Sequence, residues 1–201
     1  MQVQSELIIP FITYAVVTSI TPGPNNVSSA SAGMQMGYRK SLPYLYGIVV
    51  GFFILLAVAG LLTGFITGMY ESFSPVLKWI GIVYMLWLAV VPFLPGKTKK
   101  QNSSTYGYSF FSGMILQLVN IKAILYSITI FSSFAGLISG SAGTIILSAV
   151  FLTLVTFGCI SIWALIGSTL SNYFENKRFY IAFNAVMALL LVYSAVSILY
   201  N

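Results

Sequence analysis

The stretch TPGPNN, residues 21–26, lies in the middle of a long apolar run that covers about residues 5–37. A helix cannot continue through this stretch, because Pro22 and Pro24 lack an amide donor and each proline ring clashes with the preceding turn. Such a break leaves carbonyl groups free at the end of one helix and amide groups free at the start of the next. We therefore expect an interrupted helix with unpaired backbone polar groups at the break. A packing kink in a structural helix is the alternative.

The composition indicates a membrane protein. Hydrophobic residues make up 58% of the 201 residues, charged residues make up 6%, and the mean hydropathy is +0.94. A soluble domain carries about 25% charged residues, so this chain cannot cover a water-facing surface. The net charge of +6 does not indicate nucleic-acid binding, because most of the basic residues fall in short loops near Arg39, Lys97–Lys100 and Lys177. That pattern is typical of cytoplasmic loops beside membrane lipid.

Six apolar segments are long enough to cross about 30 Å of hydrocarbon. They cover about residues 5–37, 43–67, 76–95, 108–137, 144–171 and 180–200. The connections between them alternate between basic loops and loops without lysine or arginine. An all-α integral membrane protein with six transmembrane helices and both termini outside the cytoplasm satisfies this alternation. We expect residues 1–201 to form a single transmembrane domain.

A basic cytoplasmic linker, residues 96–107, divides the chain near its middle. On each side of it, an overlong segment is followed by two ordinary spans. Because three is an odd number, the second half enters the membrane from the opposite side. The pattern predicts two inverted three-helix repeats, residues 1–95 and 108–201, whose paired broken helices build a substrate site near the midplane. The alternative is that six spans divide into three and three without common ancestry.

The fourth span contains the polar residues Gln117, Asn120 and Lys122 within the stretch LQLVNIKAILY, residues 116–126. Lys122 lies about 14 residues, or roughly 20 Å, into its span. A lysine near the bilayer centre costs about 2.5–3.5 kcal/mol on insertion scales. Lys122 therefore either faces a wet cavity or loses its proton, because burial disfavours the charged form. The alternative is a lysine satisfied by backbone carbonyls of a neighbouring broken helix.

Together, the two interrupted segments predict a binding site for a zwitterion. Free amides at a helix start favour an anion such as a carboxylate, and Lys122 adds a full positive charge. Free carbonyls and amide side chains could hold an ammonium group, and tyrosines could also line the cavity. A second cationic group on the substrate would fit poorly, which favours a small neutral amino acid. The candidate site residues are Pro22, Gly23, Pro24, Asn25, Asn26, Gln117, Asn120, Lys122 and Tyr126.

Other sequence features exclude several kinds of chemistry. The chain has no histidine and no acidic or cysteine cluster, so we expect no metal site and no cofactor. An intramembrane enzyme would need an acid–base pair or a metal cluster, and the sequence offers neither. The chain also has no phosphate-binding loop, so nucleotide-driven pumping is not expected. Trp163 and Cys159 are expected to be apolar filling. Glycines at 47, 51, 60, 64 and 68 predict close helix packing within the bundle, or alternatively a homodimer face.

The chain resembles the LysE/RhtB superfamily of amino-acid exporters. The resemblance is carried by TPGPNN in the first span, LQLVNIKAILY in the fourth, TFG with WALIG in the fifth and ALLLVYSAV in the last. It implies six helices in the bacterial inner membrane. It also implies export of a small amino acid or its acetylated precursor, with proton antiport as the drive. The nearest resemblance is to the subgroup that exports cysteine and O-acetylserine.

By position, the resemblance carries over residues 22–26, Asn120 and Lys122 as site residues, with Lys122 as the proton-coupling group. Most superfamily members have Asn-Pro-Lys in the fourth span, whereas Ile121 stands at the proline position here. The change removes the fixed break from that helix. The alternatives are an exporter of another amino acid (homoserine, threonine, leucine or a basic one), a passive channel and a non-transporting assembly subunit.

Overall fold

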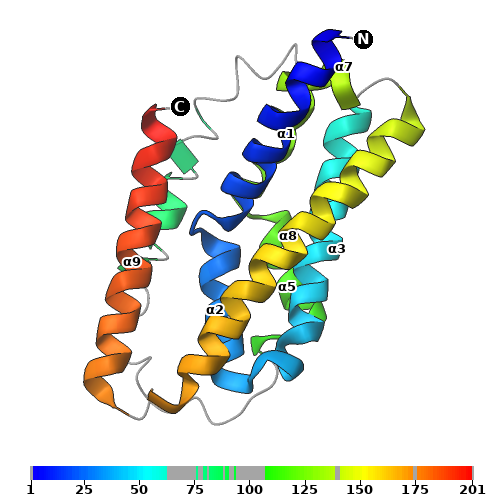
Figure 1. Cartoon of the computed structure of the whole chain (residues 1–201). Coiled ribbons are helices and arrows are strands. Elements are labelled where there is room, and N and C mark those ends of the chain that lie inside the picture. Colours follow the sequence, from blue (N-terminus) through cyan, green and yellow to red (C-terminus); the bar gives the residue numbers. More distant parts are fainter. Residues whose placement is uncertain are drawn as a thin grey trace.

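A computed structural model describes residues 2–62, 76, 79–80, 82–87, 89–90, 93, 107–138, 141–173 and 176–200. Every regular element in these residues is helical, which confirms the all-α class (Figure 1). Of the expected third span, 76–95, only isolated residues and the helical stretch 82–87 are described. The linker expected at 96–107 lies outside the described residues except for its last position.

The first span is broken at the expected place. Helix α1 covers Gln2–Ile20 and helix α2 covers Pro24–Met36, and their axes are bent by 50°. Pro24 occupies the first turn of α2, where a missing amide breaks no intrahelical hydrogen bond. After α2, Gly37 adopts a φ of 76°, a conformation that glycine reaches without strain. The turn at Gly37 lets the next helix begin directly after it.

The fourth span is also broken, although it contains no proline. Helix α5 covers Phe110–Leu118 and helix α6 covers Ile121–Ser133, with a bend of 61° between them. The short helix α7, Ala135–Ile138, completes the segment. Asn120 is the N-cap of α6, and its side chain accepts a hydrogen bond from the backbone amide of Lys122. An asparagine in this N-cap position stabilises a new helix start.

Within the residues that the structure describes, two helices are long and apolar enough to cross a membrane unbroken: α3, Tyr38–Leu61, and α8, Ala142–Leu170. The two bent pairs pass the same test when each is counted as one span. Helix α9, Lys177–Tyr200, follows the short 3-10 turn Ser171–Tyr173. Helix α3 starts five residues and α9 three residues earlier than the sequence pattern predicted.

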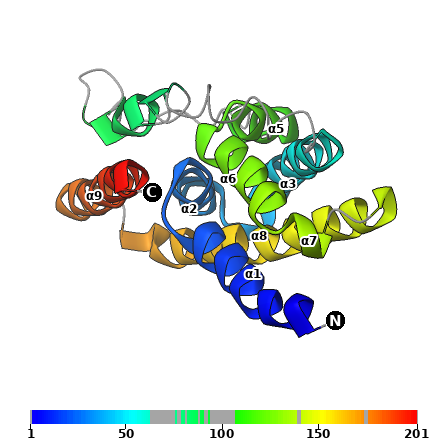
Figure 2. The ribbon, with the colours of Figure 1, turned by 90° about the horizontal axis from the view of Figure 1, so that it is seen from above.

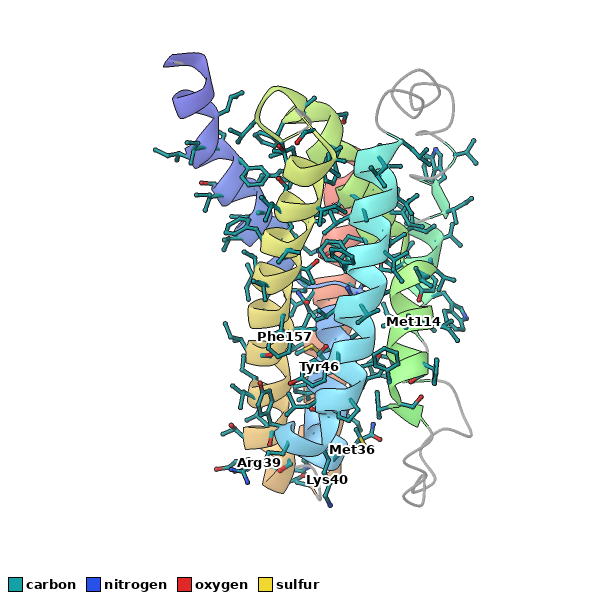
Figure 3. The ribbon with its side chains drawn as sticks, turned by 90° about the vertical axis from the view of Figure 1, so that its right-hand side faces the viewer. Met36, Arg39, Lys40, Tyr46, Met114 and Phe157 are labelled. Carbon is teal, nitrogen blue, oxygen red and sulfur yellow. The ribbon has the colours of Figure 1, made fainter. Side chains whose placement is uncertain are left out.

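The described helices place both termini at one end of the bundle (Figure 1). The α2–α3 and α8–α9 connections lie at the other end, where Arg39 and Lys40 are exposed (Figure 3). This agrees with the alternation of basic loops in the sequence. Large apolar side chains such as Leu147 and Leu154 of α8 are exposed on the outer surface. Such a surface is suited to contact with hydrocarbon.

Helices α2 and α8 pack with their backbones in direct contact. A Cβ added to Gly33 would lie 1.9 Å from the carbonyl oxygen of Ala164, and one added to Gly167 would lie 1.9 Å from that of Ala30. Seen along the bundle, α2 lies between α9 and α6, with α8 beside it (Figure 2). Small residues permit this approach. The contact holds α2, which begins at the first break, against α8.

The glycines of α3 also pack inside the bundle. A Cβ on Gly47 would lie 1.9 Å from a backbone oxygen of α5, and one on Gly51 would lie 2.9 Å from another. Gly60 faces side chains of α6 and α8. These three glycines therefore serve the bundle, the first of the two uses expected for them. Gly64 and Gly68 lie outside the described residues.

Candidate functional site

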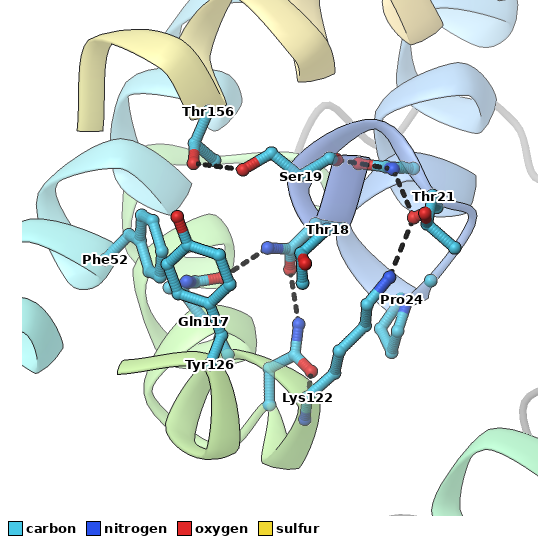
Figure 4. Close-up of a pocket in the computed structure, with 14 residues that line it drawn as sticks. Thr18, Ser19, Thr21, Pro24, Phe52, Gln117, Lys122, Tyr126 and Thr156 are labelled. Atoms are coloured by element: carbon cyan, nitrogen blue, oxygen red, sulfur yellow. Dashed lines mark hydrogen bonds between the residues drawn. The ribbon is translucent and has the colours of Figure 1, made fainter. Parts of the chain in front are cut away.

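The two breaks meet through Lys122. This residue lies in the first turn of α6, and its Nζ donates hydrogen bonds to the carbonyl oxygens of Thr21 at 2.8 Å and Pro22 at 3.3 Å. A Cβ added to Gly23 would lie 3.0 Å from Lys122 Cδ, so the Pro-Gly-Pro turn packs on the lysine stem. The ammonium group points across the bundle to the first break (Figure 4). Backbone carbonyls therefore do bind this lysine, as one of the two sequence interpretations expected.

The carbonyls freed by the first break are also bound by side chains of three further helices. Asn26 Nδ2 lies 2.9–3.1 Å from the carbonyl oxygens of residues 19, 20 and 21. Trp163 Nε1 of α8 donates to Ile20 O at 3.2 Å, and Ser194 Oγ of α9 donates to Pro22 O. Buried carbonyls need such partners, because an unpaired one is costly. Trp163 thus has a polar role, which corrects its expected assignment to apolar filling.

A chain of amide side chains joins the two breaks at a second point. Asn25 Nδ2 donates to Gln117 Oε1 at 2.5 Å, and Asn120 Nδ2 donates to Asn25 Oδ1 at 2.8 Å. Gln117 is fully buried, and its Nε2 has no hydrogen-bond partner among the described residues. This series of hydrogen-bonded amide side chains therefore ends at an unsatisfied donor, Gln117 Nε2, inside the bundle.

A cavity of about 40 Å³ lies where these groups meet. It has room for about three water molecules, which is too small for a free amino acid. Its walls come from α1, α2, α3, α5, α6 and α8 and from the residues at the two breaks. The lining residues are Thr18, Ser19, Thr21, Gly23, Pro24, Asn25, Asn26, Phe52, Gln117, Asn120, Lys122, Ala123, Tyr126 and Thr156.

The structure brings all nine candidate site residues together, although they come from two segments about a hundred positions apart. Eight of them line the cavity, and Pro22 lies beside it and contributes the carbonyl that Lys122 contacts. Sequence reasoning missed Thr18 and Ser19, although hydroxyls just before a helix break were a usable signal. It also missed Phe52, which stands in an ordinary apolar span, and Thr156, which begins the TFG stretch of the fifth span that carries the family resemblance.

The cavity has two electrostatic sides. The start of α2 carries no side-chain cap, so its first amides face the break with the positive end of the helix dipole. The Lys122 ammonium adds a charge close to them. The carbonyls of Thr21 and Pro22 and the amide oxygens of the asparagines are acceptors. An arrangement of this kind can hold a carboxylate and an ammonium group at neighbouring points.

Comparisons with known proteins identify relatives over almost the whole chain. It is similar to cysteine/O-acetylserine efflux proteins of Klebsiella pneumoniae subsp. pneumoniae (36% identity, 96% of each chain) and of Salmonella paratyphi A (34% identity, 96% of this chain and 98% of the relative). The protein of that name from Escherichia coli O1:K1 is 33% identical over 96% of this chain and 98% of its own. No solved structure matches the chain.

The family model described as LysE type translocator matches residues 16–201. That region holds both helix breaks and every residue lining the cavity. Members of a translocator family are transporters, so the alternative of an intramembrane enzyme is rejected. The chain belongs to the LysE type translocator family and is a multi-pass protein of the bacterial inner membrane.

Proposed function

We propose that this protein is a secondary transporter that exports small neutral amino acids or derivatives, of the cysteine and O-acetylserine type, from the cytoplasm. Membership of the translocator family supports export in general. The names of the curated relatives, cysteine/O-acetylserine efflux proteins, support this substrate class.

The observation that carries the proposal is the cavity between the two breaks, with Lys122 on its wall. Two of the three ammonium protons of Lys122 are directed to the carbonyls of Thr21 and Pro22. A substrate ammonium group can take over those carbonyls, and Lys122 then turns to the substrate carboxylate. The free amides at the start of α2 bind the same carboxylate. A third charged group on a basic amino acid finds no carboxylate among the cavity-lining residues.

Release of the substrate requires the cavity to widen toward each side of the membrane in turn. We infer that residues 1–95 and 108–201 are inverted repeats whose relative movement does this. In support, the first broken span runs from the end that holds both termini toward the basic end, and the second runs in the opposite direction (Figure 1). Each break lies partway along its span, close to the shared cavity.

Proton antiport is the drive we propose, with Lys122 as the proton-coupling group. Among the residues that the structure describes, Lys122 is the only lysine or arginine that lines the cavity. When a substrate ammonium displaces it from its two carbonyls, Lys122 can release its proton to the cytoplasm and bind the substrate carboxylate as a neutral amine, because burial disfavours the charged form. Export of one substrate would then be coupled to inward movement of the proton that recharges the lysine.

Counterflow in proteoliposomes tests the function. Vesicles loaded with unlabelled O-acetylserine, cysteine, threonine, leucine or lysine are diluted into a trace of labelled O-acetylserine or cysteine. We expect labelled substrate to accumulate transiently with the small neutral amino acids inside and not with lysine. Absence of counterflow with every amino acid would refute the transporter proposal. For the coupling, inside-out vesicles with an acidic lumen should take up substrate faster than vesicles without a gradient, and uptake indifferent to the gradient would refute it.

A further inference from the structure

We propose that the hydroxyl groups of Ser19, Tyr126 and Thr156 form a subsite for the polar end of the substrate side chain. The exporter would then select short side chains that carry a hydroxyl, a thiol or an acyl oxygen over apolar side chains of the same size. This inference rests on the proposed function, because it assigns the side-chain end of the same substrate.

The three hydroxyls lie together on one side of the cavity. Ser19 Oγ and Thr156 Oγ1 are 3.2 Å apart, and either can be the donor. Figure 4 shows the hydroxyl of Tyr126 turned toward this pair, while Lys122 lies on the opposite side of the drawn residues. All four residues line the cavity. A substrate whose carboxylate and ammonium lie at Lys122 would therefore extend its side chain toward the hydroxyls.

The Tyr126 hydroxyl has no hydrogen-bond partner within 3.5 Å among the described residues and interacts with the side chain of Ser19 only at longer range, and the residue is only 4% exposed. Its ring is held in place, stacked on Tyr14 at 5.6 Å and tilted against Phe52 at 5.3 Å between ring centroids. The hydroxyl cannot leave the cavity by a small rotation. A buried hydroxyl without a close partner is destabilising, and unlike the Thr153 hydroxyl this one belongs to a residue that lines the cavity, so a ligand in the cavity can supply the partner.

Gln117 supplies a second unfilled donor. Its Oε1 is already bonded to Asn25, and its Nε2 is buried without a partner in the described part of the chain. The subsite therefore offers two donors that lack acceptors, together with a hydroxyl pair that can donate or accept. A side chain with an acceptor oxygen or sulfur would fill them. Phe52 and Ala123 add apolar surface to the lining of the cavity.

Selectivity follows from the penalty for leaving such groups unpaired. A site built to hydrogen-bond a substrate group strongly rejects an analogue without it, because the polar atoms of the site then stay buried and unsatisfied. A purely apolar pocket discriminates weakly between a hydroxyl or thiol and a methyl group of the same size. Isosteric substrate pairs can thus separate the two kinds of pocket.

The test uses the full-length protein in proteoliposomes and three isosteric pairs as probes: serine with 2-aminobutyrate, reduced cysteine with 2-aminobutyrate, and threonine with valine. Half-inhibition of labelled O-acetylserine counterflow is measured for each member. We expect the wild type to prefer the polar member by about tenfold or more, the value of one hydrogen bond. Tyr126→Phe and Thr156→Val should each bring that ratio close to one, while inhibition by the apolar member stays the same.

Thr153→Val is the matched control. Thr153 lies one turn before Thr156 on α8, is also buried without a hydrogen-bond partner in the described region, and does not line the cavity. The preference of Thr153→Val for the polar over the apolar member of each pair should equal that of the wild type. Equal inhibition by both members of each pair in the wild type, or an unchanged ratio in Thr156→Val, would overturn the inference while the exporter proposal stands. Loss of all counterflow in the wild type would instead refute the exporter proposal.

Discussion

The two broken spans reach the same cavity by different means. The first is interrupted by Pro22 and Pro24, which leaves a row of carbonyls that nothing in α1 or α2 except Asn26 can bind. The second is interrupted without proline, at Asn120, whose side chain caps the new helix locally. The bends are similar, 50° and 61°. A proline break cannot close again, whereas a break made by a cap depends on one side chain.

The difference gives the two breaks unequal roles. The first break offers acceptors, and most of its donors come from elsewhere: Lys122 of α6, Trp163 of α8 and Ser194 of α9. The second break supplies the one charged donor of these three, the Lys122 ammonium group. Substrate exchange at the first break therefore has to disturb the second break, which is a physical reason for the two halves to move together.

Replacing Lys122 with methionine should have the largest effect, because it removes the group that joins the breaks. Methionine keeps the length and the apolar stem, and it removes a charge that is costly in hydrocarbon, so the folded protein should remain. We expect the counterflow rate to fall by about tenfold to hundredfold, which corresponds to the free energy of one hydrogen bond to a charged group. The control is Lys40→Met, an exposed lysine at the end of the bundle. Normal transport by Lys122→Met would contradict the site.

The next largest effect should come from Asn26→Ala, and it should appear in stability. Asn26 is only 3% exposed, and its Nδ2 lies within hydrogen-bond distance of three carbonyls of the first break. Trp163 still binds the carbonyl of Ile20 and Lys122 that of Thr21 in the variant, so the Ser19 carbonyl is the one left without a side-chain donor. The loss should lower the free energy of unfolding by about 2 kcal/mol, or about 4–8 °C in the unfolding midpoint in detergent.

Gln35→Ala is the control for Asn26→Ala, since it removes an exposed amide from the same helix. Its midpoint should stay within about 2 °C of the wild type, as is usual for surface substitutions. Equal midpoints for the two variants would mean that the first break does not need its local cap.

The sequence could predict the break at residues 21–26 and the depth of Lys122, because both are local conflicts between residue type and an apolar helix. It could not predict that Trp163 binds the carbonyl of Ile20, since the two residues are far apart in the chain and the indole matches its apolar surroundings. Phe52 was missed for the same reason. The family's proline is replaced by Ile121 here, which weakened the expectation of a second break. The structure has the break all the same, because the Asn120 side chain caps the start of α6.

The second break can be tested by separating the two hydrogen bonds of Asn120. Asn120→Ala removes the cap of α6 and the bond to Asn25, and should lower the free energy of unfolding by about 1 kcal/mol, or about 2–4 °C. Asn120→Ser keeps a good capping residue but is too short to reach Asn25. Its midpoint should be near that of the wild type, while its transport is reduced. If serine destabilises as much as alanine, the cap is not what holds this break.

The smallest effect should come from Ile121→Pro, which turns the second break into one of the first kind. Ile121 is the first residue of α6, where an amide has no intrahelical partner and proline is favoured. The preceding residue, Asn120, has φ −76° and ψ 102°, the extended conformation that a following proline requires.

We therefore expect the unfolding midpoint of Ile121→Pro to lie within about 2 °C of the wild type, with transport retained. Ile124→Pro is the matched control, because its amide donates to the carbonyl of Asn120 at 3.0 Å. Losing that bond inside the helix should cost about 3 kcal/mol or more. A large loss of stability in Ile121→Pro would mean that the second break has to straighten during transport or folding, and the two broken spans would then differ in mechanism as well as in construction.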